Sequence, residues 1–298
     1  MKFVRSIILP LLVGAATAAE IKVSSLHPLL GDLTRNVGGE RVEVIDLLGK
    51  DSDPHSFEPD PAQLKKAADS DFFIASGMGL ESYLDSLRTI LPKSTPIVVL
   101  GDDLPSIEGS CSTCDGHDHG DHDHSHHDHG VDPHWWHSID TFRRAVNLTA
   151  DALIKADPDG EKTYRANALA YRGKLDELER WTRREIARIP KERRILATAH
   201  AAFGYFCKDY GFEAIPVSGL NREQMPDPRT LSKLIEKLRA DKVAAIFPED
   251  ISNPKTLEAL TEDTGITLAP PLIADGTTAD SYEAMIRHNV TTIVEALK

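Results

Sequence analysis

Three histidines that are far apart in the chain, His55, His134 and His200, share a setting in which an imidazole can reach a metal ion. His55 and His134 each follow an Asp-Pro pair, and the proline limits the entropy lost when such a loop binds a ligand. His200 follows a predicted strand at 194–198, and an acidic residue near position 275 follows another. Because open α/β sheets bind ligands beyond the carboxyl ends of their strands, we expect these side chains to meet.

Three neutral imidazoles and one carboxylate oxygen are a typical ligand set for tetrahedral zinc. A manganese site contains more oxygen ligands and fewer imidazoles, because harder cations prefer oxygen. The residue types therefore predict Zn²⁺ as the bound ion. Manganese or another divalent metal is the alternative.

A second group of histidines lies in one short tract at 117–129, together with four aspartates, one serine and one glycine. Its seven histidines are His117, His119, His122, His124, His126, His127 and His129. This composition is typical of metal-binding segments and contains almost nothing that a core could bury. We expect a mobile loop that binds several ions weakly and raises the local metal concentration near the main site.

The other metal-capable side chains have less specific settings. We expect His27 to pack or to be solvated, with a role in supporting a ligand or as a fifth ligand as the alternatives, and we expect His137 to be solvated rather than to reach the same cleft. Cys111 and Cys114 form a C-x-x-C pair, for which a local disulfide, a redox pair and metal binding all stay open. Cys207 lies in an apolar run and is expected to be a buried thiol.

The elements that must position these residues alternate between strands and helices in two series, before and after a proline-free helical stretch. Such alternation predicts parallel sheets flanked by helices, and 298 residues suffice for two lobes with separate cores. We therefore expect two α/β lobes joined by a single long rigid helix. The predicted boundaries are 19–155 for the N-terminal lobe, including a His-rich loop at 115–130, 156–190 for the linking helix and 191–298 for the C-terminal lobe.

The first residues have the pattern of a secretion signal, with Lys2 and Arg5 before an apolar run and small residues up to Ala18. We expect cleavage after residue 18 and a free periplasmic protein, since no cysteine stands at the cleavage point for a lipid anchor. The formal charge of −13 becomes more negative when the signal is removed. Such a surface repels nucleic acid and anionic membranes, so neither is an expected partner.

The chain also resembles the metal-binding solute proteins of the ABC transporters for zinc and manganese, in their zinc-specific branch. The resemblance covers nearly the whole mature chain and is carried by several motifs. These are Val37-Gly-Gly-Glu40, Asp53-Pro-His55, Phe57-Glu-Pro59, Asp132-Pro-His134-Trp135, His200-Ala-Ala-Phe-Gly-Tyr205, Phe247-Pro-Glu249 and the segment Tyr282–Asn289. It implies zinc held between two lobes, with His55 and His134 from the first lobe and His200 from the second.

The fourth ligand departs from the family pattern. The family usually has an aspartate about twelve residues before the tyrosine matched by Tyr282, and Pro270 occupies that position. We assign the ligand to Asp275, where the following glycine gives the backbone freedom to bend. Glu249, Asp280 or a water molecule are the alternatives.

Together these features predict a monomeric periplasmic protein that captures zinc and delivers it to the permease of an ABC importer. A periplasmic metallochaperone is a further candidate partner. A zinc buffer that works without a transporter is a second hypothesis. A zinc hydrolase is a third, but the chain has no H-E-x-x-H motif and we expect no enzymatic activity.

Overall fold

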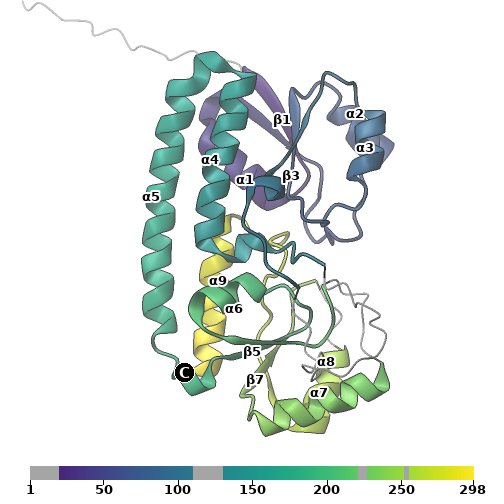
Figure 1. Ribbon diagram of the computed structural model, residues 1–298, viewed down its shortest axis with the longest axis vertical. Coiled ribbons are helices and arrows are strands. Elements are labelled where there is room, and N and C mark those ends of the chain that lie inside the picture. Colours follow the sequence, from purple (N-terminus) through teal and green to yellow (C-terminus); the bar gives the residue numbers. More distant parts are fainter. Residues whose placement is uncertain (1–19, 110–129, 221–226, 252–254) are drawn as a thin grey trace, which may run out of the picture.

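The computed structural model describes residues 20–109, 130–220, 227–251 and 255–298. Within them the chain forms two α/β lobes, each built on a parallel sheet of four strands. The strand orders are β2-β1-β3-β4 and β6-β5-β7-β8, so the second sheet repeats the topology of the first. Figure 1 shows the lobes one above the other, with a pair of helices beside them. The predicted fold class is confirmed.

The first lobe places a helix after each of its first three strands, as parallel pairing requires. Its elements are β1 Ile21–Ser25, α1 Pro28–Gly38, β2 Val42–Asp46, α2 Pro61–Lys66, β3 Phe72–Ala75, α3 Leu84–Ile90 and β4 Ile97–Val99. Helix α1 has proline in its first turn, and Gly39 after its end adopts φ 59°. The loop between β2 and α2 carries His55, at the carboxyl end of the sheet.

Two long helices form a layer on one side of the molecule (Figure 1). Helix α4 covers Ile139–Ala156 and α5 covers Glu161–Ile186, with a 3₁₀ turn at Pro158–Gly160 between them. The 26 residues of α5 correspond to about 39 Å of helix. Helix α4 lies beside the first lobe, and α5 runs past both lobes. The predicted linking helix at 156–190 is therefore present, although it begins and ends several residues inside that range.

The second lobe repeats the alternation of strand and helix. Its elements are β5 Ile195–Thr198, α6 Gly204–Tyr210, β6 Glu213–Pro216, α7 Pro228–Ala240, β7 Ala245–Phe247, α8 Lys255–Thr264, β8 Thr267–Leu268 and α9 Tyr282–Leu297. The expected strand 267–272 is shorter because two prolines follow it, which lack the N–H that a ladder needs. Pairing resumes at one point, where Leu272 bridges Glu249.

The main hydrophobic core is continuous between the lobes. One cluster of buried side chains includes Leu33 of α1, Phe142 of α4, Leu175 of α5, Phe206 of α6 and Ile293 of α9. A smaller cluster lies within each lobe. Because both lobes contribute to one packed core, large movements between them would expose buried apolar surface.

The His-rich tract lies outside the described residues, as do Cys111, Cys114 and the predicted signal peptide. The described residues that flank the tract form a short antiparallel neck, with Glu108 bridged to Val131 and Gly109 N–H bonded to the Gly130 carbonyl at 2.9 Å. Cys207 is buried in α6, as expected. Among the described helices, none has the length and apolarity to cross a membrane.

Candidate metal centre

The four side chains predicted from the sequence converge on one point between the lobes. His55, His134, His200 and Asp275 each offer a ligand atom, and these four atoms lie within 4.8 Å of one another. Nε2 of His134 is 3.1 Å from Nε2 of His55 and 3.2 Å from Nε2 of His200. The Asp275 carboxylate is 3.6 Å from His55 and 3.7 Å from His134.

These spacings fit a tetrahedral metal ion. Four ligands at the zinc bond length of about 2.0–2.1 Å are about 3.3 Å from one another in a tetrahedron. Four of the six separations, at 3.1–3.7 Å, bracket that value, and all six lie within 4.8 Å. The space among the four atoms suits a single ion and excludes an organic ligand.

His55 is the most exposed of the four. It lies in the loop after β2, where its backbone N–H donates to Asp53 Oδ1 at 2.9 Å. Its side chain is 11% exposed, whereas those of His134, His200 and Asp275 are fully buried. His55 therefore marks the side from which an ion can enter.

His134 is oriented by Asp132. One carboxylate oxygen accepts both the backbone N–H of His134, at 2.9 Å, and its ring Nδ1–H, at 2.8 Å. This bond leaves the Nε2 lone pair directed to the centre. Burial, together with the rings of His200 and His55, holds the pKa of His134 well below its ordinary value, which keeps the imidazole neutral for coordination. Burial raises the pKa of Asp132 to about 7, and a cation at the centre would favour its charged form.

Glu249 has the same relation to His200. Its Oε2 lies 2.5 Å from Nδ1 of His200, and its Oε1 accepts the His200 backbone N–H at 2.9 Å. Both carboxylate oxygens therefore contact His200, and Glu249 lies behind the imidazole rather than among the four converging atoms. Asp280 is also outside that set, because its side chain is 87% exposed and pairs with Lys50 at 3.0 Å.

Asp275 lies in the loop between β8 and α9, before Gly276. Gly276 has φ +67°, a conformation that glycine adopts freely, and a Cβ there would lie 2.6 Å from the Leu29 side chain. The glycine thus permits both the turn and its close approach to α1. The expected role of this glycine in shaping the loop agrees with its geometry.

Two further histidines border the centre, and one expectation about them is wrong. His137, expected to be solvated, is buried, and its Nε2–H donates to the Ala274 carbonyl at 2.7 Å. His27 is buried at the start of α1, where its Nδ1 accepts the Leu29 N–H at 3.3 Å and its ring lies 4.7 Å from Trp136. Burial lowers the pKa of both histidines to about 3. The Trp-Trp-His sequence after His134 indicated an apolar wall, but not that the wall would enclose His137.

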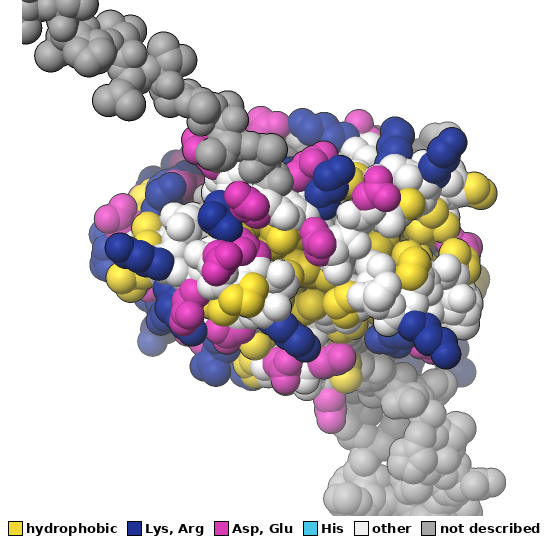
Figure 2. Space-filling model, turned by 90° about the horizontal axis from the view of Figure 1, so that it is seen from above, with side chains coloured by type: hydrophobic (Ala, Val, Ile, Leu, Met, Phe, Trp, Pro, Cys, Tyr) yellow, Lys and Arg dark blue, Asp and Glu magenta, His cyan; other side chains and the backbone are white. Residues whose placement is uncertain are grey.

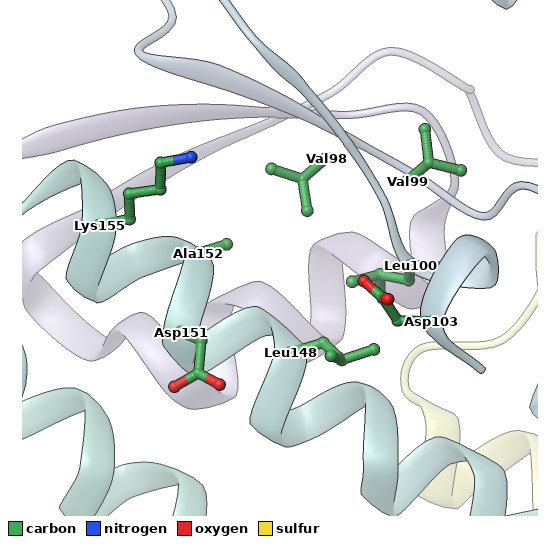
Figure 3. A pocket seen from close by; sticks show the side chains of 8 residues that line it. All are labelled: Val98, Val99, Leu100, Asp103, Leu148, Asp151, Ala152 and Lys155. Carbon is green, nitrogen blue, oxygen red and sulfur yellow. The ribbon is translucent and has the colours of Figure 1, made fainter.

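A separate surface hollow of about 260 Å³ lies between β4 and α4. Its lining is mainly aliphatic and contains none of the four metal-centre residues (Figure 3). At the first-lobe end of the molecule, acidic and basic side chains are interspersed over the described surface (Figure 2). Neither feature offers a second group of converging ligand atoms.

The fold and this centre define a solute-binding protein that carries a metal ion between two lobes. Residues 23–296 match the family described as ZnuA, zinc-uptake complex component A, periplasmic, and the chain belongs to this family. Solute-binding proteins of the family work with the permease and ATPase of an ABC importer and are not enzymes. The hydrolase hypothesis is therefore excluded.

Similar proteins carry names that refer to two metals. The manganese-binding lipoprotein MntA of Halalkalibacterium halodurans is 30% identical over 282 residues, which are 93% of this chain and 88% of that protein. The MntA of Bacillus subtilis is 29% identical, over 96% and 92%. The periplasmic zinc-binding protein TroA of Treponema pallidum superposes with a TM-score of 0.81 and 26% identity, over 94% of this chain and 99% of that one.

Proposed function

We propose that this protein captures Zn²⁺ through His55, His134, His200 and Asp275 and delivers it to the permease of an ABC importer. The observation that carries the proposal is the convergence of three imidazole nitrogens and one carboxylate oxygen within 4.8 Å. The imidazoles are in place for coordination, with Asp132 and Glu249 bonded to the Nδ1 atoms of two of them.

The choice of zinc rests on the ligand types. Three nitrogens and one oxygen at tetrahedral spacing suit zinc, whereas manganese favours octahedral sites rich in oxygen. Manganese capture is a second candidate, because the MntA relatives are named manganese-binding. The same four side chains would then need additional oxygen ligands, from water or from a bidentate Asp275.

A competition titration separates the two metals. Metal-free protein without residues 1–18 is titrated with Zn²⁺ and with Mn²⁺, each alone and each against a chromophoric chelator. We expect one tight zinc site per chain, and we expect an equal concentration of zinc to displace bound manganese. Tighter binding of manganese would contradict the choice of zinc while leaving the site intact.

For the cell, we propose cleavage after Ala18 and release of a free monomer into the periplasm. A periplasmic metallochaperone that loads the centre is compatible with this location. The sequence pattern of residues 1–18 supports the cleavage, and the amino-terminal sequence of exported protein tests it. A mature chain that begins at Ala19 is expected, and an uncleaved leader would contradict it.

We further propose that the tract 117–129 is an auxiliary collector of zinc. Its seven histidines would bind ions weakly, because each capture must order a polar segment. A variant with this tract replaced by Gly and Ser at equal length should lose the weak sites and keep the tight one. Loss of the tight site would show that the tract belongs to the main centre.

A further inference from the structure

We infer that Trp136 and His137 are positioning residues for Asp275 and attach this ligand to the first lobe. The inference rests on the proposed function, in which Asp275 binds the metal. Asp275 is carried by the chain of the second lobe, between β8 and α9. The residues on either side of it in the chain, Ala274 and Gly276, nevertheless contact the segment before α4 and helix α1.

The Ala274 carbonyl is the first of these contacts. It accepts two hydrogen bonds, from the indole Nε1–H of Trp136 at 2.9 Å and from the Nε2–H of His137 at 2.7 Å. Both donors are buried, at 1% exposure. The Ala274 carbonyl belongs to the planar peptide group that contains the Asp275 nitrogen and Cα. Two bonds to one oxygen therefore fix the plane from which the Asp275 side chain projects.

The residues after Asp275 are held in the same way. Gly276 lies against Leu29 of α1, as its close approach shows. At the start of α9, the Tyr282 N–H donates to Asp32 Oδ2 at 3.0 Å, and the Tyr282 hydroxyl donates to the Trp136 carbonyl at 2.9 Å. The segment from Ala274 to Tyr282 thus lies mainly on α1 and on the turn that follows His134, with one bond to the second lobe, from the Thr278 hydroxyl to the Asp250 carboxylate.

His200 is attached differently. It follows β5 of the second sheet, and Glu249, which orients it, follows β7 of the same sheet. Leu272 is still bound to the second lobe, because its N–H donates to the Pro248 carbonyl at 2.9 Å. Ala274, two residues later, is bound to the first lobe through Trp136 and His137. The centre therefore divides into His55, His134 and Asp275 on one body and His200 on the other. A small displacement of the second sheet during release would therefore withdraw His200 alone.

The test is a double-mutant cycle on zinc affinity. His137→Leu removes the bond to Ala274 and keeps an apolar side chain against Phe203, whose ring centroid lies 4.3 Å from that of His137. We expect zinc affinity to fall about 10–100-fold, the usual effect of losing a residue that orients a ligand. In the Asp275→Ala background the same substitution should change affinity less than twofold, because the ligand it positions is already gone.

His288→Gln is the matched control. His288 Nε2–H also donates to a backbone carbonyl close to Asp275 in the chain, that of Pro271 at 2.9 Å. Pro271 precedes Leu272, however, where the chain is still bound to the second lobe. We expect no change in zinc affinity. His137→Gln, which can still donate to Ala274, should recover part of the loss. Trp136→Phe tests the same carbonyl through its other donor, because it removes only the indole N–H and keeps an aromatic ring.

Co²⁺ absorption supplies an independent readout. In His137→Leu we expect the tetrahedral bands to shift toward those of Asp275→Ala, whereas a general loss of stability would leave the bands of the bound fraction unchanged. Equal losses of affinity in both backgrounds, or none in either, would overturn the inference. If the wild-type chain binds no zinc tightly, the proposed function fails. If Asp275→Ala alone leaves affinity unchanged, the ligand assignment fails, and the inference fails with it.

Discussion

At the residue scale, the centre depends on pairs rather than on single side chains. His134 and His200 each bond through Nδ1 to a buried carboxylate, Asp132 or Glu249. Each carboxylate also accepts the backbone N–H of the histidine that it orients. This double contact fixes both the tautomer and the direction of the ring, so that Nε2 is available to the metal.

Glu249→Gln should weaken zinc binding about 10–100-fold, the usual cost of losing such a contact. The glutamine amide offers one acceptor oxygen, which cannot accept from both the backbone N–H and Nδ1 with the present geometry. Isothermal titration with a competing chelator measures the change. Glu258→Gln, a substitution of the same type at an exposed position of α8, is the control. An unchanged zinc affinity in Glu249→Gln would show that Glu249 does not orient His200 for binding.

His137 also predicts a pH effect on the metal-free protein. Burial lowers its pKa to about 3, whereas an imidazole in the unfolded chain titrates near about 6.5. Below that pH the unfolded chain binds a proton that the folded chain excludes, so stability falls as pH falls. At pH 5 the loss from His137 is about 2 kcal/mol.

The measurement is the free energy of unfolding at pH 7 and pH 5, compared between the wild type and His137→Leu. A difference between proteins is needed, because the raised pKa values of the buried carboxyl groups of Asp132 and Glu81 act in the opposite direction. We expect the variant to lose about 2 kcal/mol less than the wild type on acidification. An identical loss in both would contradict the buried neutral state of His137.

At the element scale, the sequence predicted most of what positions the metal centre. Alternating strands and helices predicted both sheets, and His55, His134 and His200 were found because each lies in a connection that follows a strand. The loop around Asp275 was predictable only in part, because its course depends on bonds from Trp136 and His137, more than a hundred residues earlier. Local patterns contain no signal for such contacts, and for the same reason the burial of His137 was missed.

Gly276→Ala tests the geometry of that loop. Alanine at φ +67° is strained, and its Cβ would also meet Leu29, so we expect a loss of stability of about 1–3 kcal/mol and weaker zinc binding. Gly211→Ala is the control, with φ +70° and no atom within 4 Å of the added Cβ. It should lower stability without changing zinc affinity. Equal zinc affinity in both variants would show that the Gly276 turn does not position Asp275.

At the scale of the whole molecule, shared packing holds the lobes together in addition to the linking helix α5. Helices α4, α5 and α9 share one apolar core with both lobes. The Tyr205 hydroxyl of α6 also donates to the Asp132 carbonyl of the first lobe at 3.2 Å. These contacts favour small adjustments about the centre over a wide hinge opening.

Small-angle scattering of the metal-free and zinc-loaded protein tests this rigidity. We expect the same radius of gyration within experimental error, because separation of the lobes would expose the shared core. The tract variant with Gly and Ser at 117–129 should be measured in parallel, so that a change in the loop is not mistaken for a change between lobes. A clear compaction on zinc binding would contradict the rigid description.

The most direct test of the central claim is a crystal structure of the zinc-loaded protein, with the metal identified by anomalous scattering at the zinc edge. The account predicts one strong peak between the lobes, about 2.0–2.1 Å from the Nε2 atoms of His55, His134 and His200 and from a carboxylate oxygen of Asp275. A peak at another position, or a fourth ligand other than Asp275, would contradict it.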